Sequence, residues 1–476
     1  MRVSATYIKQ RREAMNVIAQ SGKRLSDWSE RNMPNPYLFA VILTFIAYFM
    51  GWILTDNGPM DMIKHWYDGF WKYLTFAMQM VLILVTGHAL AIAPGVHPFL
   101  KRLARIPKSG GQAVLMTAYV ATIMTYFHWG LGLIVASIFA REVAKEGYLK
   151  KIHFHYPLIA AAAYTGQMVW HIGPSTSAGL LSATKGHVFE KIIGIIPVTE
   201  SVFTSYAIML AIMLCLIVVP ITMWLMTPKD PEECMGIDDC LGTDKVEAEI
   251  QETEDTGKGE KSSSTQKKGF ADMLENSWVI SYVVGLAGII YIIYYFATKG
   301  LSLNLNIFNF LFLIAGIILH RTPIRYVRAI TTATPGSSGI ILQFPFYAGI
   351  MGMISYSGLA AIITTWFLGF ATAASFPVIA WITGGIVNIF IPSGGGEWGV
   401  IGGIIGQISL DLGVPVGKSI VAYGCGDMWT NMFQPFWAIA LLGITGLRAR
   451  DIMGYCITLM IVSAPFIALG LYFFPY

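Results

Sequence analysis

Long apolar runs recur along the whole chain, and they constrain the fold more than any other feature of the sequence. Each run is about 16–25 residues long, the length that a helix needs to cross the hydrocarbon core of a bilayer. Only 13% of the residues are charged, against about 25% in ordinary globular domains. The sequence therefore predicts an all-α, polytopic membrane protein with about 10–12 hydrophobic segments. The runs occupy 37–55, 73–94, 112–127, 156–182, 203–226, 277–297, 304–319, 338–354, 357–373, 376–392, 418–445 and 452–474.

Two further segments, 128–140 and 394–412, are apolar but short and rich in glycine. Non-helical backbone at membrane depth is tolerated only where it is buried in protein or lines a wet cavity. We therefore expect these two segments to form re-entrant hairpins or broken helices instead of complete spans.

The hydrophilic stretches divide the chain into four parts. We expect a cytoplasmic N-terminal arm over 1–36, a first membrane repeat over 37–226, a linker over 227–276 and a second membrane repeat over 277–476. The stretch from Thr227 to Phe270 carries twelve acidic and six basic residues, which is typical of a flexible connector. Clusters of Lys and Arg in the loops predict that the linker is cytoplasmic and that the C-terminus lies on the opposite side.

Each membrane half contains a related pair of motifs. Phe127–Gly130 is followed by Tyr164–Met168, and Gly396–Gly399 is followed by Tyr423–Met428. In this comparison residue 128 matches 397, residue 167 matches 427, and His171 roughly matches Asn431. Gly-interrupted apolar segments in corresponding positions of two halves indicate the binding site of a transporter.

The basic residues differ in position between the two copies. A cluster over 141–151 precedes the Gly-x-Met segment of the first half, whereas Arg448 and Arg450 follow that segment in the second half. The same unit is therefore predicted to enter the membrane from opposite sides, as an inverted repeat does.

Polar residues beside two predicted helix breaks suggest an anion site. Pro392 ends one helix, and Ser393 with Gly394, Gly395 and Gly396 then offers a hydroxyl and backbone N–H groups to an anion. In the first half, Gly173 and Pro174 break the helix before three hydroxyl residues, Ser175, Thr176 and Ser177. His128, Trp129 and Trp398 are further candidates for the walls of the site. Because no Arg or Lys lies firmly within an apolar run, neutral donors are expected to hold the anion.

Ionisable residues inside the apolar runs are few, and each is a functional candidate because an intramembrane charge is costly. Glu397 and Asp427 are the acidic ones; either can carry a coupled proton. Alternatively, Asp427 with Thr430, Asn431 and Asn388 can supply oxygen atoms to Na⁺. His171 and His128 are weaker candidates, and His88 is more simply a buried or pore-lining residue. The five cysteines show no metal-binding or disulfide pattern, so we expect no cofactor other than H⁺ or Na⁺ as a coupling ion.

Four long motifs resemble the bacterial short-chain fatty acid transporter family of the acetoacetate/butyrate type. They are Phe127–Gly132, Met168–Ser175, Phe390–Trp398 and Gly426–Pro435. The resemblance covers nearly the whole chain and implies uptake of short monocarboxylates across the bacterial inner membrane. It also implies membership of a wider ion-transporter superfamily, with inverted repeats, a moving transport unit, a scaffold and often a homodimer.

Two alternatives remain at this stage. A transporter of another organic anion, such as a dicarboxylate or an amino-acyl compound, fits the same pattern, although two negative charges would favour a core Arg. An intramembrane hydrolase would need a nucleophile motif, and neither Gly-x-Ser-x-Gly nor His-Glu-x-x-His occurs. The partners we expect are the monocarboxylate, membrane lipid and a second copy of the chain, with no nucleic acid.

Overall fold

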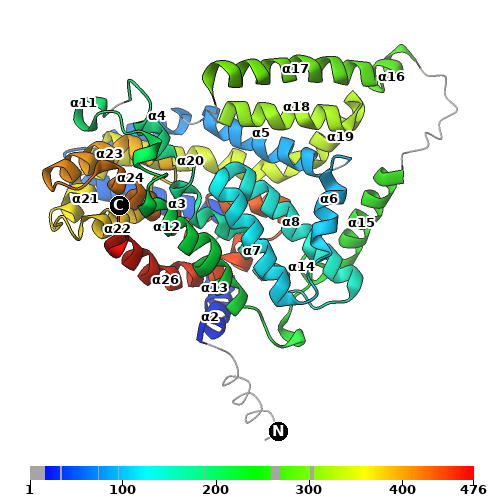
Figure 1. Cartoon of the computed structure of the whole chain (residues 1–476), viewed down its shortest axis with the longest axis horizontal. Helices are drawn as coiled ribbons and strands as arrows, with labels where there is room; N and C mark the ends of the chain where they lie inside the picture. The colour runs from blue at the N-terminus through cyan, green and yellow to red at the C-terminus, as the bar shows by residue number, and fades with distance from the viewer. Residues whose placement is uncertain are drawn as a thin grey trace, which may run out of the picture.

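The computed structural model describes residues 17–32, 35–72, 74–94, 96–187, 189–258, 269–300 and 305–476. Within these ranges the chain is helical and contains no strand, which confirms the predicted all-α class (Figure 1). Five helices of the described part are long and apolar enough to cross a membrane. They are Tyr37–Leu54, Ser205–Leu225, Trp278–Lys299, Pro323–Tyr356 and Ala449–Phe473. Shorter apolar helices span Ala77–Leu90, Asn309–His320 and Phe376–Asn388.

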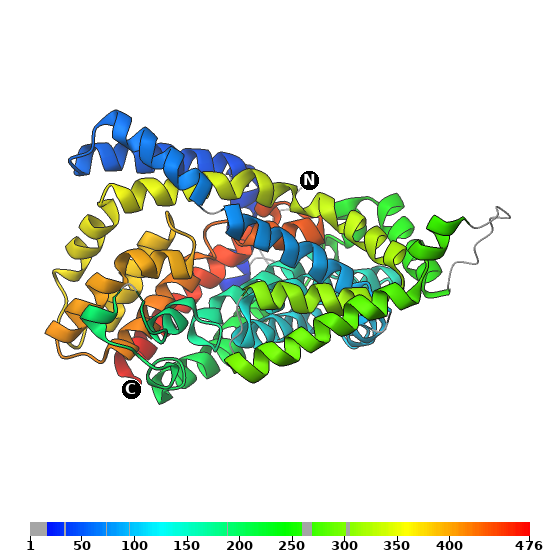
Figure 2. The ribbon, with the colours of Figure 1, turned by 90° about the horizontal axis from the view of Figure 1, so that it is seen from above.

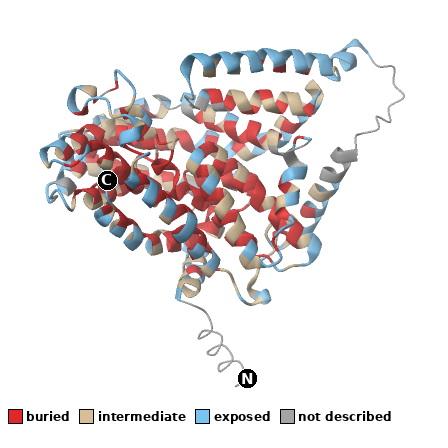
Figure 3. Cartoon of the chain, in the orientation of Figure 1, coloured by how far each residue is buried: buried red, intermediate tan, exposed pale blue. Residues whose placement is uncertain are grey.

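Large apolar side chains on the outside of the molecule fit a membrane environment. α17 (Trp278–Lys299) buries only 17% of its most apolar window inside the protein, and Figure 3 shows it as a largely exposed helix. It packs on α18 (Leu305–His320) along one side, where Gly285 and Gly288 meet the side chains of Ile318 and Ile314. The remaining apolar face of α17 is exposed, as is typical of a helix in a multi-pass membrane protein.

The first short segment predicted from sequence belongs to a pair of helices. α7 (Gly110–Phe127) and α8 (Trp129–Lys150) pack together and are separated only by His128. The predicted end at residue 140 was too early, because α8 continues for ten more residues rich in Ala, Glu, Lys and Arg, which favour helix. Arg141 and Lys145 are therefore part of α8 and do not lie in a loop.

The second short segment is also a complete helix. α22 (Phe376–Asn388) ends before the break at 389–393, and α23 (Gly394–Asp411) begins immediately after it. Pro392 and the Ser393 cap account for the break and the new start. The chain therefore does break where the sequence predicted, although α22 ends at Asn388, a few residues before the predicted end at 392.

Two helices in the interior are interrupted. α9 (Tyr156–Tyr164) is wholly buried and gives way to two short 3₁₀ turns, Thr165–Met168 and Trp170–Ile172, before α10 (Ser177–Ser182). α24 (Val416–Thr430) ends before a non-helical stretch over 431–437, and α25 (Ala438–Thr445) follows. The sequence predicted one continuous run over 418–445; Pro435 prevents that continuity because it lacks an N–H and restricts the residue before it.

The first part of the acidic linker is helical and docked against the membrane part, which differs from the flexible connector we expected. α14 (Ile237–Leu241) and α15 (Thr243–Lys258) bury Ile237 and Val246. Glu249 accepts from the Arg141 guanidinium at 2.6 Å and lies 3.4 Å from Lys145 Nζ. Apolar burial and ion pairing together hold this part of the linker, while the Ser262–Thr265 run lies outside the described residues.

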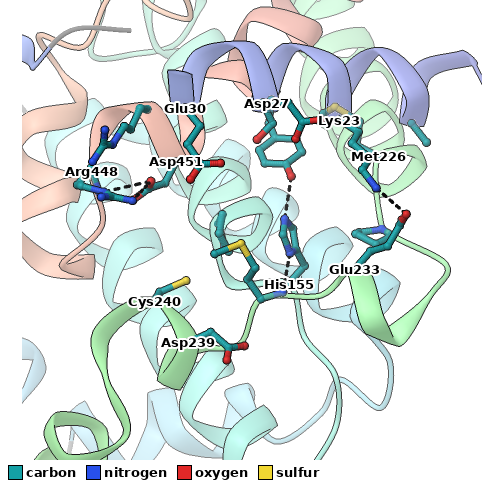
Figure 4. Close-up of a pocket in the computed structure, with 17 residues that line it drawn as sticks. Lys23, Asp27, Glu30, His155, Met226, Glu233, Asp239, Cys240, Arg448 and Asp451 are labelled. Atoms are coloured by element: carbon teal, nitrogen blue, oxygen red, sulfur yellow. Dashed lines mark hydrogen bonds and ion pairs between the residues drawn. The ribbon is translucent and has the colours of Figure 1, made fainter. Parts of the chain in front are cut away.

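The N-terminal arm is docked at a neighbouring place. Residues 1–16 of the arm lie outside the described residues, and α2 (Val17–Asn32) packs along α26 (Ala449–Phe473). A cavity of about 190 Å³ lies between α2, the linker and the start of α26, and Figure 4 shows the residues that line it. His155 crosses it: Nδ1 accepts from the Met235 N–H at 3.0 Å, and Nε2 lies 2.7 Å from the Tyr455 hydroxyl.

These contacts define two ends of the molecule. The linker helices α14 and α15 lie with α6 (Val96–Ala104) at one end, which we call the basic end, and Lys145 contacts α15 there (Figures 1 and 2). The C-terminus lies at the other end. Lys418 stacks over the Tyr206 ring, and that ring contacts Tyr476 at the C-terminus. Lys145 and Lys418 therefore occupy opposite ends.

We expect Glu249→Gln to loosen the docked linker. The substitution removes the charge that pairs with Arg141 and Lys145, which is worth about 1–2 kcal/mol for a charge-assisted contact. Amide hydrogen exchange over α15 should therefore become about 5- to 30-fold faster. Glu247→Gln is the matched control, because Glu247 accepts from Tyr148 at the exposed surface. Equal exchange rates in the two variants would contradict the role given to Glu249.

The same contact predicts the pH dependence of docking. Partial burial raises the pKa of the Glu249 carboxyl, but the positive charges of Arg141 and Lys145 together lower it by more. The pKa therefore lies below its ordinary value of 4.5. A carboxyl whose pKa is lowered in the docked state contributes its full stabilisation at pH values above its ordinary pKa. That contribution is lost as the pH falls through the lowered pKa. Protection of α15 from exchange should therefore persist on acidification to pH 4.5 and fall below it.

Candidate functional site

Three helix N-termini meet in the interior of the molecule. Ser175, just before α10, accepts a hydrogen bond from the backbone N–H of Trp129, the first residue of α8, at 3.2 Å. On the other side, a Cβ built on Gly395 would lie 3.4 Å from Cβ of Ser177, so the first turns of α10 and α23 are in contact. The two breaks that the sequence predicted to face one another are therefore adjacent.

Each of these helix starts is capped by a side chain. His128 Nδ1 accepts from the N–H groups of Gly130 and Leu131 at 3.2 and 3.4 Å. Thr176 caps α10 through the Gly179 N–H, and Ser393 caps α23 through the Gly396 N–H, both at 3.3 Å. Helix N-termini carry partial positive charge and favour anions, so three of them around one point provide an anion-binding environment without a cationic side chain.

Several groups at this junction are accessible. Ser175, Ser177, Ser393, Gly395 and Gly396 are partly exposed, whereas Thr176 and Gly394 are buried. The buried position of Gly394 is close to aromatic rings: an added Cβ would lie 2.6 Å from Trp170 Cη2 and 2.7 Å from His171 Cε1. Only glycine fits that approach, because real Cβ atoms do not come so close to other heavy atoms.

The two predicted acids lie behind the N-terminus of α23. Glu397 is fully buried and Asp427 is 1% exposed. The two carboxyl groups interact with each other, and Glu397 also interacts with Tyr423, whose hydroxyl donates to the Gly394 carbonyl at 3.0 Å. A bound cation or proton would stabilise two acids that are buried this close together.

His171 lies beside Asp427 in the interior of the molecule. Its Nδ1 lies 3.3 Å from Asp427 Oδ1, and both side chains are buried. No Lys or Arg forms an ion pair with Asp427 or Glu397 among the residues that the structure describes. The sequence comparison matched His171 with Asn431, whereas the structure places it against Asp427.

A polar network extends from Asp427 along the break after α24. The Asn388 amide lies 2.8 Å from the Asp427 carbonyl, 3.0 Å from Thr430 Oγ1 and 3.0 Å from Asn431 Oδ1. Gln434 donates to the Asn388 carbonyl at 3.3 Å. The structure therefore brings the predicted ion-coupling residues Asn388, Thr430 and Asn431 together around the backbone carbonyl of Asp427.

Sequence reasoning missed two residues of this site. Gln434 joins the Asn388 network, and Tyr423 lies between Glu397 and Asp427. Both occur inside motifs that the sequence singled out, Gly426–Pro435 and Tyr423–Met428. A polar side chain directly before Pro435 was the available signal for Gln434; the role of Tyr423 follows only from the packing of α23 on α24.

The two tryptophans proposed as site walls differ in position. Trp398 is fully buried, donates from Nε1 to Ser182 Oγ at 2.9 Å and packs on Tyr423 with ring centroids 4.8 Å apart. Trp129 is 8% exposed and packs against Trp170 and Trp437. Trp129 therefore lies nearer to the accessible junction, and Trp398 holds α23 against α10.

The first residues of α8 and α23 give a different alignment of the two halves from the one that the sequence motifs gave. His128 is the N-cap of α8, and Ser393 is the N-cap of α23. By position in the helix, His128 therefore corresponds to Ser393, whereas Glu397 lies one turn further inside α23.

Comparisons with known proteins agree with the sequence resemblance. A family model described as "Short chain fatty acid transporter" matches residues 17–474. A protein of Escherichia coli K12 named "Putative short-chain fatty acid transporter" is 38% identical over 458 residues, covering 96% of this chain and 100% of the relative. A protein of the same name from Haemophilus influenzae Rd is 37% identical over 466 residues, with 96% and 100% coverage.

Two solved transporters are similar to the chain over most of its length. The Alcanivorax borkumensis YdaH transporter, described as having an unusual topology, aligns with a TM-score of 0.39 and 16% identity, covering 92% of this chain and 98% of that one. Neisseria gonorrhoeae MtrF, from a class of antimetabolite efflux pumps, aligns with a TM-score of 0.36 and 13% identity, covering 94% and 97%.

Proposed function

Because the chain belongs to the short-chain fatty acid transporter family, we propose that it imports short monocarboxylates such as butyrate or acetoacetate together with H⁺ or Na⁺. The family assignment makes the chain a membrane transporter and not an enzyme. The proposal concerns the substrate, the coupling ion and the residues that bind them.

The meeting of three helix N-termini is the observation that carries the proposal. The carboxylate would accept hydrogen bonds from Ser393, Ser175 and Ser177 and from backbone N–H groups over 394–396, while its short alkyl chain would contact Trp129. Helix dipoles and neutral hydrogen-bond donors stabilise a negative charge only over a short distance. They are therefore sufficient for a single carboxylate. Since Asp427 pairs with a histidine and not with Arg or Lys, the site provides no fixed cation for a second negative charge.

Ion coupling follows from the buried acids next to this junction. A cation or proton at Asp427 or Glu397 would offset the charge of the carboxylate and reduce the repulsion between the two buried acids. His171, Asn388, Thr430 and Asn431 would complete this part of the site. The electrochemical gradient of that ion would then drive accumulation of the substrate.

Alternating access is supported by the two interrupted helices, one in each half. Transporters built from inverted repeats place such breaks at the midplane and expose the site by rocking one unit against another. The opposite positions of Lys145 and Lys418 agree with antiparallel threading. We propose further that the protein lies in the bacterial inner membrane with the basic end in the cytoplasm, that the N-terminal arm is also cytoplasmic, and that the protein works as a homodimer.

Uptake by reconstituted protein tests this function. Vesicles containing the protein should accumulate radiolabelled butyrate or acetoacetate when an inward pH or Na⁺ gradient is imposed, and should lose the label when an ionophore dissipates that gradient. Unlabelled monocarboxylates should compete, and dicarboxylates or amino-acyl compounds should not. Failure of both gradients would refute coupling, and stronger competition by dicarboxylates would assign the chain to another organic anion.

A further inference from the structure

His171 joins the proposed substrate site to the buried acids. Its Nε2 accepts a hydrogen bond from the backbone N–H of Ala178, in the first turn of α10, at 3.2 Å. Its Nδ1 lies 3.3 Å from Asp427 Oδ1. Because Nε2 accepts, a neutral imidazole carries its proton on Nδ1, the nitrogen that faces Asp427. One ring therefore contacts the helix start that would bind the carboxylate and the acid that would bind the ion.

The ring is held firmly in this position. It stacks on Trp170 with centroids 4.1 Å apart and an interplanar angle of 7°, and the Tyr423 ring meets it edge-on at 5.6 Å. Added Cβ atoms on Gly394 and Gly424 would lie 2.7 Å from His171 Cε1 and 3.2 Å from Cγ. The glycine backbones of α23 and α24 thus enclose the ring, which cannot turn unless these helices move.

We propose that His171 is the positioning residue through which substrate binding and ion binding influence each other. A carboxylate at the start of α10 competes for or displaces the first-turn N–H groups, and this changes the Nε2 contact and the approach of Nδ1 to Asp427. An ion at Asp427 acts on α10 through the same two contacts in the reverse direction. This inference rests on the proposed symport, and linkage requires the two effects on affinity to be equal.

The coupling factor is the quantity to measure. It is the ratio of butyrate affinities of purified protein in nanodiscs at saturating and at vanishing concentration of the ion whose gradient drives uptake. For wild-type protein we expect a factor within the usual range of about 5 to 150. His171→Phe keeps a ring on Trp170 but loses both polar contacts, so the factor should fall below about two while the affinity without the ion changes less than about three-fold.

Two further variants separate the polar contacts from packing. His171→Gln offers an amide oxygen to Ala178 and an amide N–H to Asp427, so it should recover part of the coupling factor. His171→Ala should lose coupling in the same way as His171→Phe, and added imidazole should restore it. His88→Phe is the control, since His88 is a histidine of a different helix, α5 (Leu74–Ala91), that the site does not use.

The outcomes distinguish this inference from the proposed function. If butyrate affinity of the wild-type protein does not depend on either ion, the symport itself fails and the inference with it. If wild-type affinity is ion-dependent and His171→Phe or His171→Ala keeps the same factor, symport stands and the role of His171 is overturned. The Ala variant with imidazole decides the question even if the Phe variant does not fold.

Discussion

Asp427→Asn should abolish gradient-driven accumulation of butyrate, with a loss of about 100-fold, while exchange of labelled for unlabelled butyrate across the membrane continues. Asparagine has nearly the same volume as aspartate, so the packing of α24 against His171 and α22 is retained. The lost charge removes the group that would bind the coupling ion, and coupling energies of 1–3 kcal/mol correspond to about 5- to 150-fold. Uptake and counterflow in the same vesicles provide the two measurements.

Glu397→Gln tests the second buried acid in the same assay. Glu397 interacts electrostatically with Asp427, so we expect accumulation to fall in this variant as well. Asp411→Asn is the matched control, because Asp411 lies exposed at the end of the same helix as Glu397 and contacts Gln407. Wild-type accumulation by both Asp427→Asn and Glu397→Gln would remove the acids from the mechanism.

The membrane class and the first helix break were predictable because their causes are local. An apolar run of sufficient length specifies a spanning helix wherever it occurs. Gly173 and Pro174 precede the start of α10 as predicted, although α9 already ends at Tyr164, and Ser393 caps the helix that follows Pro392. These features depend on neighbours within a few residues, which the sequence displays directly.

The contacts of the site were less predictable because they depend on which segments meet. His171 and Asp427 lie in different halves of the chain, and the match of His171 with Asn431 in the internal comparison says nothing about which side chain contacts His171. The N-caps of α8 and α23, His128 and Ser393, correspond to one another, whereas the Trp-Gly motifs matched His128 with Glu397. A cap position and a motif position need not coincide. The docking of the linker was not predictable for the same reason. It depends on the ion pair between Glu249 and Arg141, a residue of α8 that lies far from Glu249 in the sequence.

Gly394→Ala should reduce transport about 5- to 150-fold, whereas Gly399→Ala in the same helix should leave it unchanged. A methyl group at 394 would lie 2.6 Å from Trp170 and 2.7 Å from His171, and both rings are buried and enclosed, so the start of α23 must move away from α10. Such overpacking costs about 1–3 kcal/mol, about 5- to 150-fold in affinity. At 399 an added Cβ meets nothing within 4 Å.

The pair of glycine variants isolates geometry from helix propensity. Alanine in place of glycine favours helix by about 1 kcal/mol in a helix interior, so a general stiffening of α23 would affect Gly399→Ala at least as much as Gly394→Ala. Displacement of the helix start from the proposed carboxylate site affects Gly394→Ala alone and raises the KM for butyrate more than it lowers the maximal rate. Uptake kinetics normalised to the amount of protein in the membrane measure both quantities. Equal KM values for the two variants would show that contact between α10 and α23 does not form the binding site, and the assignment of the substrate to the three helix N-termini would have to be abandoned.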